Sequence, residues 1–251
     1  MKTKLVLILL SLSSLTAFGA TNADEYKLGN GAVILETQEI KPNRTLLLWM
    51  VRPVKHPREA SSEPYSCPEY TRGNFYSGPT RVSLVDPQAH KVINTIKVSL
   101  DSDGAGDDFD LPYEIRSDYY YHVEGVAKEA EGKPTIMWLK DYNGDGNAWE
   151  FALFNAEACM GLATTLIGFS ERQDKVIQYQ THLTVTKSKG KRSTVTGRWT
   201  DYLFSKEAER PGNWKYEVDY QGRGGPLDKY EVRYDSKAER FEGKLTESGE
   251  E

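Results

Sequence analysis

A six-residue pattern, K-Y-E-V-x-Y, occurs twice near the C-terminus and restricts the fold more than any other segment. The two copies occupy residues 215–220 and 229–234. Each copy places two tyrosines and a valine on one side of an extended chain and charged residues on the other, which is typical of a strand with one buried face. Because apolar residues recur at every second position, these segments predict paired strands and not helices.

The rest of the sequence also consists mainly of short segments with strand-like patterns. Turn residues recur about every ten positions and helical periodicity is almost absent, which indicates an all-β protein of about fourteen antiparallel strands. A propeller-like arrangement and a β-sandwich fit this strand number equally well, so the topology stays open. The expected strands are residues 32–40, 45–51, 81–86, 92–98, 111–115, 119–123, 135–139, 151–154, 164–169, 176–186, 194–200, 215–220, 229–234 and 240–246.

Three segments depart from the alternating pattern. Residues 46–50 form a continuous apolar run, which predicts a strand that is buried on both faces. Residues 52–79 are rich in proline and glycine and predict a long ordered loop. Residues 155–163 contain several alanines, and we expect a short helix there.

The N-terminus has the features of an export signal. Two lysines precede an apolar core at residues 5–10, and small residues follow it. This order predicts a signal peptide at residues 1–20 and a secreted or periplasmic location. Residues 21–246 then form one all-β domain or two packed β units, and residues 247–251 form a polar tail. No later segment has the roughly 20 apolar residues that a membrane-spanning helix needs, so we expect no membrane span.

The charge of the chain restricts the classes of ligand to expect, and its cysteines suggest a disulfide. The formal net charge is −5, with both signs mixed along the chain. Without a long basic tract, nucleic acid is excluded as the expected partner, whereas a glycan and a protein both stay open as ligands. The two cysteines, Cys67 and Cys159, are expected to form a disulfide in an oxidising compartment; two separately buried thiols are the alternative.

The candidate site is the segment D-Y-N-G-D-G-N-A-W-E at residues 141–150, which lies between two expected strands. Calcium takes six to eight oxygen ligands from a tightly curled backbone. Gly144 and Gly146 allow the positive φ angles that such a curl needs. The expected ligands are the side chains of Asp141, Asn143, Asp145 and Glu150 and the backbone carbonyl of Asn147.

Residues 141–146 match the core D-x-[DN]-x-D-G. The segment therefore resembles the calcium loops of β proteins of the FG-GAP/VCBS kind, which have strands on both sides. The resemblance covers about ten residues, and it implies a structural calcium ion at this loop. The family's closing acidic residue is at the ninth position, which is Trp149 here, and Glu150 follows one place later. A plain turn is the alternative, because Asn-Gly and Asp-Gly pairs also favour hairpin turns.

No familiar catalytic motif accompanies this loop. The nucleophile elbow of serine hydrolases and the paired histidines of zinc sites are both absent from the sequence. We therefore expect an exported, non-enzymatic β protein that binds calcium and acts in the envelope or in an extracellular interaction. The alternative is a secreted carbohydrate-binding module or hydrolase that uses the aromatic loop at residues 65–79 as its binding face.

Overall fold

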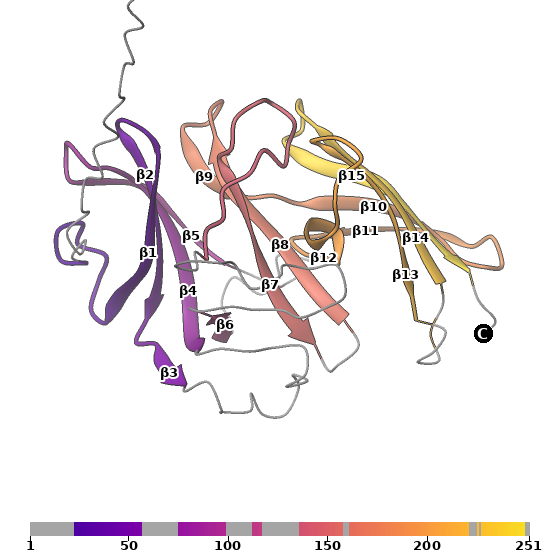
Figure 1. The fold of residues 1–251 in the computed structure, drawn as a ribbon, viewed down its shortest axis with the longest axis horizontal. Coiled ribbons are helices and arrows are strands. Elements are labelled where there is room, and N and C mark those ends of the chain that lie inside the picture. Colours follow the sequence, from indigo (N-terminus) through magenta and orange to yellow (C-terminus); the bar gives the residue numbers. More distant parts are fainter. Residues whose placement is uncertain are drawn as a thin grey trace, which may run out of the picture.

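The computed structural model describes residues 23–56, 75–98, 112–116, 136–157, 161–220, 225 and 227–248. Within these residues the fold is all-β, and the one helical segment is a short 3-10 turn, η1 (Leu203–Ser205). The strands form three sheets that follow one another along the chain (Figure 1). No described helix is long and apolar enough to cross a membrane.

The first sheet has six strands built around the long strand β4. Its strands are β1 (Ala32–Lys41), β2 (Arg44–Val51), β3 (Val54–His56), β4 (Phe75–Asp86), β5 (Lys91–Lys97) and β6 (Pro112–Arg116). The order is β1-β2-β4-β3, and β5 and β6 also pair with β4. All these pairs are antiparallel. Because β4 is twelve residues long, it can hold two partners in succession along each edge.

The middle sheet has four strands and the third sheet five. The middle sheet comprises β7 (Glu150–Glu157), β8 (Gly161–Ser170), β9 (Lys175–Gln178) and β12 (Thr200–Asp201). The third sheet comprises β10 (Thr181–Thr186), β11 (Arg192–Gly197), β13 (Asn213–Asp219), β14 (Leu227–Asp235) and β15 (Arg240–Ser248), in the order β11-β10-β15-β14-β13. Among the described strand pairs, β10 and β15 alone run parallel.

The middle sheet is covered on both faces, so the sheets stack in a sandwich-like arrangement. In β7, Phe151 and Leu153 pack in a core cluster with residues of β2 and β4. Ala152, between them in sequence, packs instead in a second cluster with residues of the third sheet. Because successive side chains of a strand point to opposite faces, the two clusters lie on opposite sides of β7.

The first sheet also has two buried faces at β2. Leu46, Leu48 and Met50 belong to the cluster shared with the middle sheet. Leu47 and Trp49 point the other way and pack with Tyr26 and Val85 in a third cluster. The prediction that residues 46–50 form a strand buried on both faces is therefore confirmed.

Several polar contacts connect the first sheet to the middle sheet, including two in which one side chain forms two hydrogen bonds. The side chain of Asn94 in β5 donates a hydrogen bond to the Val176 carbonyl in β9 at 2.8 Å and accepts one from the Val176 amide at 2.9 Å. At the outer end of the same junction, the Arg44 guanidinium donates to both carboxylate oxygens of Asp174, at 2.7 and 2.6 Å.

Most expected strands within the described residues are present, but several local predictions are wrong. Residues 136–139 are not a strand, and the pairing begins only at the bridge between Lys140 and Glu150. Of the helix expected at 155–163, the described residues 155–157 and 161–163 belong instead to the paired strands β7 and β8. The expected loop at 52–79 contains β3 and the start of β4. The expected strand at 176–186 is split into β9 and β10, and the one at 194–200 is split between β11 and β12.

Several predictions fall outside the described residues. They include the signal peptide at residues 1–20, the expected strand at 119–123 and both cysteines, Cys67 and Cys159. The end of the chain is partly described: residues 247 and 248, expected in the polar tail, are the last two of β15. The strand extends this far because Ser248 pairs with Leu227 of β14.

Candidate functional site

Backbone hydrogen bonds between the two flanking residues, Lys140 and Glu150, close the loop at residues 141–149. The Lys140 amide donates to the Glu150 carbonyl at 2.8 Å, and the Glu150 amide donates back to Lys140 at 3.3 Å. Between these residues the chain curls through Gly144 and Gly146, whose φ angles are 80° and 90°. These left-handed values suit glycine. The loop is thus compact, and it ends at Glu150, the first residue of β7.

The polar side chains of the loop accept hydrogen bonds from the loop's own amides. Asp141 accepts from Gly144 at 2.7 Å and from Gly146 at 3.0 Å. The Asn143 Oδ1 accepts from the Asp145 amide at 2.8 Å, and the Asp145 Oδ1 accepts from the Asn147 amide at 2.8 Å. Short Asp and Asn side chains stabilise turns in this way. The alternation of oxygens in the sequence therefore produces the curl itself.

Glu150 lies at the base of the loop and has no exposed surface. Its carboxylate accepts hydrogen bonds from the Tyr142 amide at 3.1 Å and from the Asn143 Nδ2 at 3.0 Å. Both donors are neutral N–H groups. Burial raises the pKa of Glu150 to about 8, and the charges of Asp145 and Asp141 also raise it, while the hydrogen bonds lower it. A carboxylate in this position is costly to ionise without a compensating cation.

Asn143 stands between two carboxylates. Its Nδ2 donates to Glu150 and also to the Asp145 Oδ2 at 3.1 Å. The orientation of the amide is fixed, because its Oδ1 accepts the Asp145 N–H, and a flipped amide would place two donors against each other. The Asn143 side chain is therefore the one donor that Asp145 and Glu150 share. It is also buried, with 8% of its surface exposed.

The loop packs against the turn that precedes β13. The Gly212 amide donates to the Tyr142 carbonyl at 3.0 Å. The Tyr142 ring stacks on Trp214, with centroids 6.4 Å apart, and meets Phe204 edge to face at 5.9 Å. A Cβ on Gly144 would lie 2.7 Å from the Pro211 carbonyl oxygen. Since β7 belongs to the middle sheet and β13 to the third, the loop forms a joint between these two sheets.

The five expected calcium ligands are brought together only in part. Asn143, Asp145 and Glu150 converge through the Asn143 amide, whereas the Asp141 carboxylate turns toward the glycine amides of the loop. Asn147 contributes its amide to the Asp145 side chain. Among the described residues, no group of three or more His, Cys, Asp or Glu side chains is placed to hold a metal ion. The donor chemistry nevertheless fits calcium, because each accepting oxygen keeps a second lone pair.

The sequence did not indicate the contacts that Trp149 and the inner side of the loop make with distant residues. Trp149, at the family's closing ligand position, packs against Phe169 with centroids 5.5 Å apart, and the Lys41 ammonium lies 4.3 Å from its ring centroid. Tyr179 is buried near Glu150, and burial together with the charge of Glu150 raises the pKa of its hydroxyl. It comes from the short segment between β9 and β10, so no local spacing connects it to the loop.

The alternative binding face is described only at its edge. Residues 65–74 of the expected aromatic loop lie outside the described residues, and residues 75–79 are part of β4 instead of a loop. Tyr76 packs against the cluster between the first and middle sheets, so its ring serves the core. Among the described side chains at residues 76–79, Tyr76 is the one aromatic residue, and it packs into the core.

Comparison of the chain with models of known protein families, with curated proteins and with solved structures found no match.

Proposed function

We propose that the chain is an exported, non-enzymatic β protein in which calcium stabilises the joint between the middle and third sheets. Export to a secreted or periplasmic location rests on the signal-like residues 1–20. The calcium ligands would come from Asp141, Asn143, Asp145, Asn147 and Glu150. When bound, the ion would supply the positive charge that the carboxylates of this loop lack.

The observation that carries this proposal is the burial of Glu150. The side chain is 0% exposed, and its hydrogen-bond donors are neutral groups of the loop. Two further carboxylates, Asp141 and Asp145, act on it electrostatically. Three acidic groups in one ten-residue segment repel one another when ionised, and a divalent cation removes that repulsion. A plain turn would need only the Asp and Asn side chains that cap its amides.

The position of the loop gives the ion a structural role. Tyr142 and Gly212 join the loop to the turn before β13, so an ordered loop holds the third sheet against the middle one. Extracellular calcium modules with dissociation constants of about 10⁻⁴ to 10⁻³ M are common and are occupied at millimolar calcium. Binding to the folded state alone raises its stability by linkage.

Thermal unfolding in calcium and in EDTA tests the proposal. At calcium about tenfold above the dissociation constant, linkage adds about 1.4 kcal/mol, which is a shift of several degrees in the melting midpoint. The Asp145→Asn variant keeps the volume and the Oδ1 acceptor but loses the charge, so its midpoint is expected to respond less. Asp219→Asn, the same change on an exposed position of β13, is the matched control. Identical midpoints in calcium and EDTA would contradict a calcium site.

A further inference from the structure

Strand β11 is the outermost strand of the third sheet, and its outer edge is open among the described strands. It pairs with β10 in a continuous antiparallel register, and no described strand pairs with its other side. The first four residues of β11 are exposed, and Val195 has 48% of its surface accessible. The opposite edge of the same sheet, β13, is partly covered, because the Glu209 amide donates to the Asn213 carbonyl at 3.0 Å.

The register determines which backbone groups of β11 face the open edge. The Lys187 amide donates to the Lys191 carbonyl at 2.9 Å, so these two residues form a hydrogen-bonded pair. Hydrogen-bonded and non-hydrogen-bonded pairs alternate along an antiparallel ladder. The backbone N–H and C=O groups of Arg192, Thr194 and Thr196 therefore point away from β10. They form a row of donors and acceptors with which another extended chain can pair.

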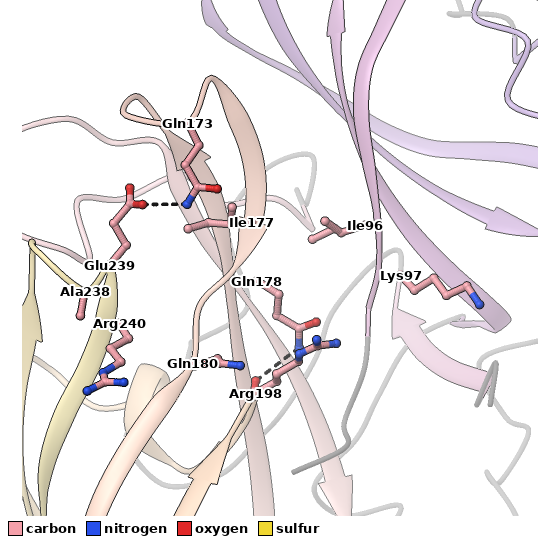
Figure 2. A pocket seen from close by; sticks show the side chains of 10 residues that line it. All are labelled: Ile96, Lys97, Gln173, Ile177, Gln178, Gln180, Arg198, Ala238, Glu239 and Arg240. Carbon is pink, nitrogen blue, oxygen red and sulfur yellow. Dashed lines mark hydrogen bonds between the residues drawn. The ribbon is translucent and has the colours of Figure 1, made fainter. Parts of the chain in front are cut away.

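The open edge ends where the chain leaves β11. Gly197 is buried, and Arg198 after it lines a groove of about 540 Å³ to which all three sheets contribute (Figure 2). The Gln178 Nε2 donates to the Arg198 carbonyl at 3.3 Å, which holds the chain to β9 at this point. The accessible row of backbone groups therefore runs from Arg192 to Thr196, the length of a short strand.

The charge around this edge is positive. Residues 175–200 contain six lysines and arginines and no acidic residue, although the whole chain has a net charge of −5. Lys191 and Arg192, at the start of β11, are both exposed. They lie at the turn between β10 and β11, at one end of the third sheet (Figure 1). A segment with acidic side chains would therefore meet complementary charge at this edge.

The same charge argues against a second copy of this chain as the occupant. Joining two copies through β11 would place Lys191 and Arg192 of both copies on one short ladder, in a stretch without acidic residues. Positive side chains on an edge strand are a common device against such self-pairing. An acidic strand avoids this repulsion and gains attraction instead.

We propose that β11 is a docking edge for an extended, acidic segment of a partner protein, which adds a strand to the third sheet. The backbone of that segment would pair with Arg192, Thr194 and Thr196, and its carboxylates would lie near Lys191 and Arg192. Successive side chains of β11 point to opposite faces, so β-branched residues in the segment would pack beside Val195. The inference is independent of calcium, because none of the expected calcium ligands belongs to β11.

Hydrogen exchange followed by NMR tests this edge in the full mature chain. The probe is a synthetic peptide of about seven residues that alternates glutamate and threonine. In the free protein the outward amides of Arg192, Thr194 and Thr196 are expected to exchange fast. The amides of Ser193 and Val195 face β10 and are expected to exchange slowly. The peptide is expected to slow only the outward set.

Three exchange results would overturn the proposal. The first is that the peptide slows neither set of amides, and the second is that it slows both sets equally. The third is slow exchange of the outward amides in the free protein, because the edge would then already be occupied. If that protection depends on protein concentration, the occupant is a second copy of this chain.

Peptides of equal length test the role of charge. The glutamate peptide is expected to bind about fivefold more tightly than a glutamine-threonine peptide, because exposed ion pairs each contribute modestly. The difference is expected to shrink with added salt. Arg192→Gln is expected to weaken binding of the glutamate peptide about twofold. Arg233→Gln, the same change at an exposed position of β14, is the control and is expected to leave binding unchanged. Equal affinity for the two peptides overturns the acidic partner.

A proline at the edge tests the docking mode. Thr194→Pro removes an outward N–H but none of the bonds to β10, and proline is tolerated on edge strands at such positions. It is expected to weaken peptide binding at least about tenfold, because the ring also blocks the approach of a strand. Thr194→Val keeps the amide and is expected to bind as the native chain does. Native-like binding by Thr194→Pro overturns the proposal. If this variant fails to fold, the exchange pattern of the native chain decides.

Discussion

The side-chain amide of Asn94 forms with Val176 the two hydrogen bonds that the backbone of a neighbouring strand would otherwise form. The two bonds are 2.8 and 2.9 Å long. The two residues are 82 positions apart and belong to different sheets. Val176 is fully buried, so water cannot replace these partners. The contact therefore couples the first sheet to the middle sheet at a point where the backbone ladders stop.

Replacing Asn94 is expected to weaken this coupling. Asn94→Ala leaves the Val176 amide and carbonyl without partners, and we expect the free energy of unfolding to fall by about 2–3 kcal/mol. Asn94→Asp keeps an acceptor for the Val176 amide but places a carboxylate against the Val176 carbonyl. We therefore expect it to lower the free energy of unfolding at least as much as Asn94→Ala does. Urea unfolding measures both, with Lys91→Ala, exposed in the same strand, as the control. A loss below about 0.5 kcal/mol in Asn94→Ala would contradict this role.

The contact between Gly144 and the turn before β13 leaves no room for a side chain. In Gly144→Ala the new Cβ would lie 2.7 Å from the Pro211 carbonyl oxygen, in addition to adopting a φ of 80°. Gly146→Ala has a similar φ of 90° but nothing within 4 Å, so it isolates the backbone cost, about 1 kcal/mol. We expect Gly144→Ala to cost about 2 kcal/mol more than Gly146→Ala in urea unfolding. Equal losses would show that the loop does not press on that turn.

Asp228 is expected to make stability depend on pH. Burial raises its pKa to about 6, as do the charges of Glu247 and Asp201, whereas a hydrogen bond from Tyr230 lowers it. Its Oδ1 is buried without a partner among the described residues. An unfolded aspartate titrates near about 3.9, so the folded state binds the proton more tightly. The stability from this group is complete below pH about 4 and is lost as the pH rises to about 6.

The Asp228→Asn variant measures this contribution. Its free energy of unfolding relative to the native chain is expected to improve by about 1–2 kcal/mol between pH 4 and pH 7, because the amide carries no charge to desolvate. Other acids, such as Asp174 and Glu239, have lowered pKa values and act in the opposite direction in both proteins. The difference between the two unfolding curves therefore isolates Asp228. A difference that does not change with pH would refute the raised pKa.

Glu150→Gln separates a calcium site from a turn. Because burial raises the pKa of Glu150 to about 8, the neutral acid predominates in EDTA at pH 7, and the amide of the variant is expected to change the free energy of unfolding by less than about 1 kcal/mol there. The increase in melting midpoint on adding calcium is expected to vanish in this variant, because a charged ligand is missing. Glu207→Gln, an exposed change near η1, is expected to keep the response. A full calcium response in Glu150→Gln would place the ion elsewhere.

Local patterns predicted the strands but not their stacking. The predictions for residues 46–50 and for the two K-Y-E-V-x-Y segments are confirmed. In both cases the order of apolar and polar residues shows whether one face of the strand or both faces are buried. The prediction for residues 155–163 is wrong, because alanines accept either conformation and the pairing of β7 with β8 decides between them. The parallel pairing of β10 with β15 joins segments far apart in sequence, which no local period encodes.

At the candidate site too, the sequence predicts the local conformation of the loop but not its packing against distant residues. The curl follows from Gly144, Gly146 and the short polar side chains around them, all of which can be identified in the sequence. The burial of Glu150 and the direction of the Asn143 amide depend on how the loop packs against distant residues such as Gly212. The groove around Arg198 is assembled from several separate segments, and no spacing within any one of them indicates it.

The middle sheet is covered on both sides by its neighbours, and this has a consequence for how the chain can acquire its structure. Ala152 and Leu166 share a core cluster with Phe241 of β15, so this face of the middle sheet is fully covered only after the last strand is added. A nascent or truncated chain that lacks β15 would display an apolar, strand-forming surface, the kind of surface that promotes aggregation. The chain is therefore expected to complete its folding late and cooperatively, when its last strand joins the sheet.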